Sequence, residues 1–196
     1  MLRFMEDSSP DLAHGTLRSD AQRNRRRLLD AAVVVILASG GEPSRDAIAK
    51  RAGVGVGTLY RHFPDRQALL RAVVLDVLDQ TIVAGEVALA ESESGVAALR
   101  RYLHDAIDIG LGVINIVHSF LDDTAWPDRL AAATDVLDRL VDRARADGVD
   151  ITAKELGLAA IRFCRPLSIG LEPAEERAIA HRQVSTYLDG LVGRAT

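Results

Sequence analysis

Apolar residues recur along most of the chain at the three- and four-residue spacing of an amphipathic helix. One such stripe runs through Leu28, Leu29, Ala32, Val33 and Ile36, and similar stripes follow almost to the end of the chain. The alternating pattern of β-strands bounded by hairpin turns is missing. The pattern therefore predicts an all-α fold.

The stretch SRDAIAKRAGVGVGTLYRHFPDR, from Ser44 to Arg66, predicts two short helices joined by a tight turn. Ser44 is a good N-cap because its side-chain oxygen can accept a hydrogen bond from the first turn. Gly53 can take the positive φ that commonly ends a helix. A second helix begins near Gly55, and Pro64 stops it because proline disfavours helical geometry in the preceding residue. This arrangement is a helix-turn-helix.

The second short helix is expected to have one apolar and one polar face. Val56, Leu59 and Phe63 would point inward, whereas the outward residues would be Thr58, Arg61 and His62. Tyr60 fits two interpretations, a partly buried packing residue or a residue that meets a partner.

Longer helices are expected on both sides of this motif. Ser19 or Asp20 can cap a helix that ends at Gly40-Gly41, and Asp65 can cap a long helix that reaches Leu89. Later, Pro127 suits the first turn of a helix, and Thr152 and Glu155 form a capping box. The remaining helices are expected over 96–109, 111–121 (short or bent), 127–146, 152–167 and 173–192.

The expected organisation has three parts. Residues 1–17 show no sustained period and are expected to be a disordered tail. Residues 18–64 form an N-terminal three-helix helix-turn-helix domain, and residues 65–196 form a C-terminal helical bundle.

Charge is distributed unevenly between these parts. The whole chain carries a formal charge of -4, yet the segment from Arg18 to Arg66 holds ten basic and five acidic residues. Several of these arginines lie in the first turns of a helix, where the helix dipole favours anions. They either contact nucleic-acid phosphates or the minor groove, or they merely solvate a basic helix end.

The run AGVGVGTLYRHFPDRQALL resembles the DNA-binding signature of the tetracycline-repressor (TetR) family of bacterial transcriptional regulators. The small-residue turn, Gly-Thr-Leu-Tyr, His-Phe and the basic residue that opens the next helix all occur at the family spacing. The resemblance covers about the first third of the chain. Two positions depart from it: Arg66 stands where lysine is usual, and Arg45 stands where an apolar residue is frequent.

The resemblance implies that the second short helix is a recognition helix lying in the major groove of double-stranded DNA. Carried over position by position, the residues expected to contact phosphates are Ser44, Arg45, Tyr60, His62 and Arg66. Those expected to face bases or their flanking phosphates are Val56, Gly57, Thr58 and Arg61.

The resemblance also implies a homodimer, held by the last two helices, that binds a palindromic operator. It further implies repression that is released by an unidentified small-molecule ligand. We expect the ligand in an apolar cavity of the C-terminal bundle, because a few polar groups in an apolar cleft are typical of such sites. The polar residues expected at its edge are Tyr102, His104, Asp108, Asn115, His118, Trp126 and Arg162.

Two smaller features leave alternatives open. His104 and Asp108 are spaced to share a metal ion, with His118 as a further ligand, but they equally suit a pocket lining or a solvated face. Cys164 lies between Arg162 and Arg165, which could lower the pKa of its thiol, or it packs in the interior. No metal or cofactor is predicted.

The main alternative in another functional class is an enzyme or carrier that uses the helical bundle, with an incidental N-terminal domain. No Ser-His-Asp set or glycine-rich phosphate loop supports it, so we expect a protein that is not an enzyme. A single cysteine, no apolar run of about 20 residues and no signal-peptide pattern favour a cytoplasmic location without membrane contact.

Overall fold

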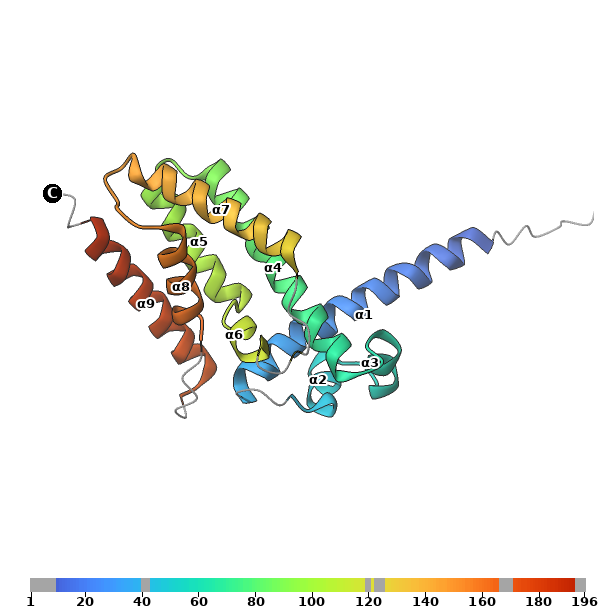
Figure 1. Cartoon of the computed structure of the whole chain (residues 1–196). Coiled ribbons are helices and arrows are strands. Elements are labelled where there is room, and N and C mark those ends of the chain that lie inside the picture. Colours follow the sequence, from blue (N-terminus) through green and yellow to red (C-terminus); the bar gives the residue numbers. More distant parts are fainter. Residues whose placement is uncertain (1–9, 40–42, 119–120, 122–125, 166–170, 193–196) are drawn as a thin grey trace, which may run out of the picture.

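In the computed structural model, every described regular element is a helix, as the sequence predicts. The described residues are 10–39, 43–118, 121, 126–165 and 171–192. The helices are α1 (Pro10–Ser39), α2 (Arg45–Ala52), α3 (Val56–His62), α4 (Arg66–Glu91), α5 (Gly95–Ile109), α6 (Val113–His118), α7 (Pro127–Arg145), α8 (Ala153–Phe163) and α9 (Pro173–Val192). Figure 1 shows α1–α3 at one end of the molecule and α5–α9 at the other, with α4 running between them.

The apolar side chains that α1, α2 and α3 bury belong to one continuous core that extends into the bundle. The almost fully buried side chains at this end include Leu28 and Ile36 of α1, Ile48 of α2, Leu59 of α3, and Phe63 directly after α3. Helix α1 packs on α2 and continues onto α4. This core fixes the orientation of the short helix α3 relative to the rest of the domain.

Helix α1 begins earlier than predicted. It starts at Pro10, so residues 10–17, which we expected in a disordered tail, belong to the helix, and residues 1–9 lie outside the described part. Proline at the first helical position loses no hydrogen bond, and its fixed φ already suits a helix. Apolar periodicity reports burial of a helix face, and among the described side chains of α1 the buried ones begin at Leu28.

Helix α4 belongs to both halves of the molecule. The Asp65 side chain caps it by accepting a 2.7 Å hydrogen bond from the Ala68 N–H. Its buried side chains extend from Leu69, near α1, to Ala88, among the C-terminal helices. One continuous helix therefore links the helix-turn-helix domain to the bundle.

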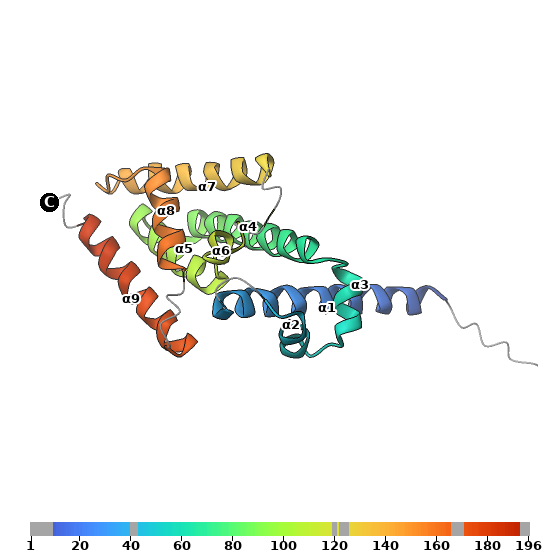
Figure 2. The ribbon, with the colours of Figure 1, turned by 60° about the horizontal axis from the view of Figure 1, so that its bottom comes forward.

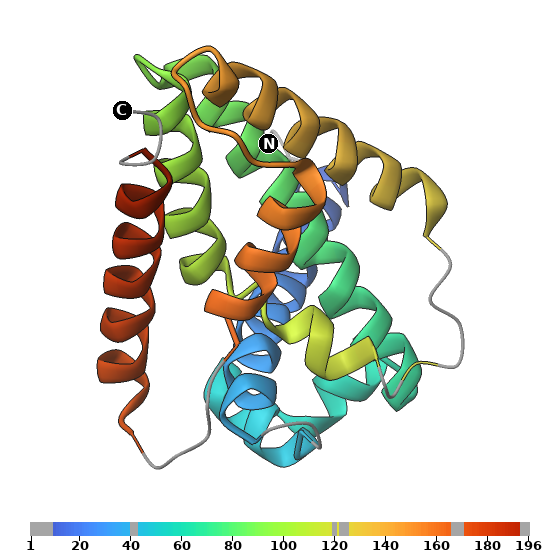
Figure 3. The same cartoon turned by 60° about the vertical axis from the view of Figure 1, so that its left-hand side comes forward.

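The bundle packs around α4, with α5 and α7 against it, α8 on α7, and α9 on α5 (Figures 2 and 3). Gly85 permits close packing of α4, because a Cβ there would overlap the Val136 side chain of α7. The predicted caps of α4 and α8 are present, Asp65 and the Thr152–Glu155 capping box. Ser19 and Asp20, which we expected to cap the first helix, lie inside α1 instead. Within the described residues, no helix is long and apolar enough to cross a membrane.

Candidate nucleic-acid interface

The turn between α2 and α3 is built as the sequence predicts. The Ser44 hydroxyl accepts a hydrogen bond from the Ala47 N–H at 3.3 Å and caps α2. Gly53 ends α2 with φ 67°, in the left-handed region that glycine enters most easily. Gly55 caps α3, and the extended backbone of Phe63, before Pro64, ends it. The caps and the turn hold α3 at a fixed angle to α2.

Helix α3 separates its packing side chains from its outward ones. Leu59 and Phe63 are buried, which confirms their predicted inward orientation. Tyr60 is 47 % exposed, so the structure favours its outward interpretation. Gly57 and Arg61 are also exposed, whereas Val56, Thr58 and His62 are half-buried at the edges of this face.

Two contacts order the polar side chains of this surface. The Arg45 guanidinium carbon lies 4.9 Å from the centre of the Tyr60 ring and so joins α2 to α3. The Arg61 guanidinium donates a 2.9 Å hydrogen bond to the Thr58 hydroxyl one turn earlier. In both contacts the partner of the arginine is neutral, so it does not offset the positive charge of the guanidinium.

Glycine is not required inside the protein at Gly57. A Cβ added there would have no atom of the chain within 4 Å, and the residue lies inside a helix, where glycine costs about 0.5–1 kcal/mol relative to alanine. Packing within the chain therefore does not explain a glycine at this position. A missing side chain on the exposed face of α3 allows another molecule to approach the helix backbone closely.

Two further predicted residues lie at the end of α3 and the start of α4. His62 packs against Phe63, with ring centres 6.2 Å apart, and Arg66 is the first residue of α4. The α1 residue Arg25 covers the other part of this corner, with its guanidinium carbon 4.9 Å from the centre of the Phe63 ring. Sequence reasoning noted the basic start of α1 but did not place Arg25 beside α3.

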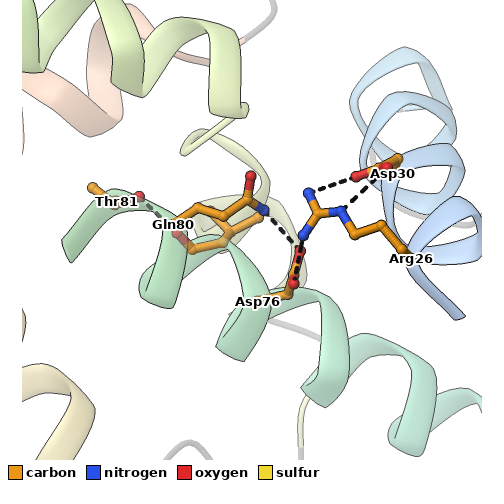
Figure 4. A network of polar contacts seen from close by, with 6 residues as sticks. Arg26, Asp30, Asp76, Gln80 and Thr81 are labelled. Atoms are coloured by element: carbon orange, nitrogen blue, oxygen red, sulfur yellow. Dashed lines mark hydrogen bonds and ion pairs between the residues drawn. The ribbon is translucent and has the colours of Figure 1, made fainter. Parts of the chain in front are cut away.

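A polar network joins α1 to α4 behind this surface (Figure 4). The Arg26 guanidinium lies 2.7 Å from the Asp30 carboxylate and donates hydrogen bonds of 3.0 and 3.2 Å to the Asp76 carboxylate of α4. Gln80 donates another to Asp76 at 2.8 Å. Burial raises the pKa of Asp76, and the charge of Arg26 opposes that shift. The network ties α1, the first helix of the helix-turn-helix domain, to the helix that leads into the bundle.

The seven residues predicted to edge a ligand cavity differ in their exposure. Tyr102 is buried, and burial raises the pKa of its hydroxyl. Trp126 is half-buried, while Asn115, His118 and Arg162 are exposed on α6 and α8. No described group of three or more His, Cys, Asp or Glu side chains could hold a metal ion.

His104 and Asp108 contact α9. The Nδ1 atoms of His104 and His181 are 2.6 Å apart, and the two rings are stacked. His181 Nε2 lies 3.2 Å from the Asp108 carboxylate, and His104 Nε2 lies 3.3 Å from the Ser185 hydroxyl. Burial is the main cause that lowers the pKa of His104, followed by the neighbouring His181 and Arg100. The pair joins α5 to α9.

A cleft of about 130 Å³ lies between the end of α1, α5 and the facing ends of α8 and α9. Its walls include the apolar side chains of Leu37, Ile107 and Phe163, and Asp108 is the one predicted ligand residue among them. Cys164 also lines the cleft; burial raises the pKa of its thiol to about 12, which favours the packing interpretation. An apolar cleft that touches both α1 and the last two helices can connect a bound molecule to both.

Comparison with known proteins extends the similarity beyond the helix-turn-helix. The family model of bacterial regulatory proteins of the tetR family matches residues 28–73. The HTH-type transcriptional repressor LfrR of Mycolicibacterium smegmatis is 32 % identical over 186 residues, which cover 94 % of each chain.

Solved structures show the same relationship. A TetR transcriptional regulator from Streptomyces coelicolor superposes with a TM-score of 0.62 at 31 % identity, covering 85 % of this chain and 97 % of that one. LfrR from Mycobacterium smegmatis in complex with proflavine gives a TM-score of 0.60 at 25 % identity, covering 84 % and 96 %. With its helix-turn-helix and a full-length relative of this similarity, the chain belongs to the TetR family of bacterial DNA-binding transcriptional regulators.

Proposed function

We propose that this protein is a transcriptional repressor that binds a palindromic operator as a homodimer and leaves it when a small molecule binds in the C-terminal domain. The observation that carries the proposal is the exposed face of α3, where Arg61 and the Arg45–Tyr60 pair stand outward over a buried apolar core. The protein would act in the cytoplasm, where bacterial DNA lies, and without catalysis.

The exposed face of α3 supports insertion into the major groove. Val56, Gly57, Thr58 and Arg61 would meet base edges or adjacent phosphates, and Ser44, Arg45, Tyr60, His62 and Arg66 would bind the backbone. Arginine can bind guanine through two hydrogen bonds, whereas a valine offers only methyl contact. Base readout by this helix would therefore depend mainly on Arg61 and Thr58.

A dimer through α8 and α9 is supported by apolar surface on these helices. Leu158 of α8 is 51 % exposed, and Tyr187 of α9 is half-buried beside Phe163, with ring centres 5.3 Å apart. Leu188, which we expected near the centre of the dimer, is only 1 % exposed in the single chain. It packs inside its own bundle, so Leu158 is the better site for a test.

The dimer is tested with Leu158→Asp. A charge at an exposed position leaves the monomer core intact but opposes burial between two copies. Light scattering should show a dimer for the wild type at micromolar concentration and a monomer for the variant. A monomeric wild type would overturn the homodimer.

DNA binding is tested by enriching genomic fragments on the immobilised protein and titrating the selected duplex by fluorescence anisotropy. Replacing Arg66 by alanine should weaken binding to all sequences and lower the salt slope by about one, because one phosphate contact is lost. Arg129→Ala, on the distant helix α7, is the matched control. Binding of the wild type with no sequence preference would contradict the proposal.

The effector is proposed to bind in the cleft between α1, α5, α8 and α9, where a ligand would touch both the DNA-binding domain and the dimer helices. Proflavine, which the LfrR structure contains, is a practical first probe. If the probe binds the protein and thereby weakens operator binding, the operator must weaken probe binding by the same factor. Equal probe affinities with and without operator would exclude this coupling.

A further inference from the structure

Helix α1 is much longer than the domain that it helps to build. Its 30 residues span about 45 Å. Among the described side chains of α1, residues 19–39, the buried ones begin at Leu28 and end at Ile36. Figures 1 and 2, seen from different sides, both show the N-terminal half of the helix continuing past α2 and α3.

One face of α1 changes character where the helix leaves the domain. Ile36, Ala32 and Leu29, which are spaced three and four residues apart, are buried against the other helices. The same spacing continues to Arg25 and Gln22, and both are exposed. The face that packs the domain thus becomes polar and cationic on the side of the molecule that carries α3.

The arginines of this segment have different surroundings. Arg23 is paired with Asp20, and Arg26 contacts Asp30 and Asp76. Arg25 instead lies over the ring of Phe63, the residue that ends α3. An aromatic ring attracts a guanidinium without neutralising it, so Arg25 keeps its charge and its N–H donors.

Arg25 is therefore held at the edge of the recognition helix. His62 packs on the same phenyl ring, and Arg66 opens the next helix three residues later. The side chains of Arg25 and His62 thus both lie against Phe63, at the point where the chain passes from α3 to α4. Their charge and their continuity with α3 fit the phosphate backbone of the duplex that α3 enters.

We propose that α1 adds a DNA contact beside the helix-turn-helix, in which Arg25 binds a phosphate next to the half-site read by α3. This rests on DNA binding by α3 and extends the contact to a helix outside the helix-turn-helix. Because a phosphate contact carries no base information, Arg25 adds affinity for every sequence rather than selectivity.

The test compares Arg25→Ala with Arg27→Ala by anisotropy titrations of the enriched operator and of an unrelated duplex, from 50 to 200 mM salt. Arg27 is also exposed, but two residues along a helix place it about 200° away on the opposite face. Loss of the Arg25 phosphate contact should lower the salt slope by about 0.9 on both duplexes. Over that salt range the variant should lose about 3.5-fold less affinity than the wild type.

Arg25→Lys and a thermal melt separate DNA contact from a purely structural role over Phe63. Lysine retains the charge and should restore most of the salt slope, whereas Arg27→Ala should behave as the wild type. A lower melting temperature of Arg25→Ala with an unchanged slope, or equal slopes for the two alanine variants, would overturn the proposal. Wild-type binding to operator is read in the same titrations, so failure of DNA recognition itself would be distinguishable.

Discussion

The helix-turn-helix and the C-terminal bundle treat their charged side chains differently. In α2 and α3, Arg45 lies over an aromatic ring and Arg61 donates to a hydroxyl. In the bundle, arginines bind carboxylates of neighbouring helices, as in Arg139 with Glu86 and Arg100 with Asp189.

The difference shows where each region uses its charge. Ion pairs at an exposed surface contribute little to stability, but they cancel charge locally. The bundle therefore offsets the charge of several arginines, and its acidic residues outnumber its basic ones, so it attracts phosphates little. The helix-turn-helix keeps cationic groups oriented but unneutralised, which suits contact with phosphates.

The largest expected effect comes from removing the core beneath the DNA-binding face. Leu59→Ala should cost about 2–5 kcal/mol of unfolding free energy, because Leu59 is fully buried between α3 and its neighbours. Urea unfolding followed by circular dichroism and by Trp126 fluorescence measures it. Since Trp126 lies at the start of α7, the helical signal of the variant should begin to fall before the fluorescence changes.

Leu130→Ala is the matched control, since the same side chain is removed from an exposed position on α7. It should change the unfolding free energy by less than about 0.5 kcal/mol. Equal effects of the two variants would mean that α3 is not stabilised by its buried face.

A pH dependence should distinguish the bundle from the helix-turn-helix. The pKa of His104 is lowered in the folded protein by burial and by His181, so the unfolded chain takes up the proton first as pH falls. The stabilisation should be complete above pH 6.5, the ordinary pKa of histidine, and should be lost as pH falls through the lower folded pKa. Besides His181, the groups facing His104 are Arg100, Asp105 and Asp108.

Urea unfolding followed by Trp126 fluorescence at several pH values between 5 and 8 measures this effect. His104→Gln should flatten the curve, and His118→Gln, on the exposed side of α6, serves as the control. An unchanged slope for His104→Gln would show that the α5–α9 contact does not respond to protonation.

The smallest expected effect sharpens the contrast between stability and binding. Gly57→Ala should raise the unfolding free energy by about 0.5–1 kcal/mol, because the added methyl meets no atom of the chain. It should also weaken operator binding, because the methyl occupies the space in which DNA approaches α3. Thermal unfolding and anisotropy measure the two effects. A variant that is more stable and binds equally well would place Gly57 outside the interface.

Local signals made the helix-turn-helix predictable. Ser44 as a cap, Gly53 at positive φ and Pro64 as a stop each act within a few residues, so their effect can be derived from the sequence around them. The capping box at Thr152 is predictable for the same reason.

Contacts between distant residues were not predictable in this way. Arg26 meets Asp76 across 50 positions, and His104 meets His181 across 77. The burial of Leu188 likewise depends on the angle at which α9 packs against α5, which helical periodicity does not specify. For this reason the caps and the turn of the helix-turn-helix were anticipated residue by residue, while the cleft near α1 was not.

Because α4 is long, a small rotation of the helix in the bundle would cause a larger displacement at its other end. Its 26 residues form a rod of about 39 Å that begins beside α3 and ends among the C-terminal helices. A rotation of about 5° around the far end would displace the Asp65 end by roughly 3 Å. Because Arg26 ties α1 to α4, the helix-turn-helix domain would move together with α4 as a rigid body. The half-sites of an operator lie about 34 Å apart, one helical turn of DNA. In a dimer, such a displacement in each subunit would change the distance between the two α3 helices by an appreciable fraction of that turn.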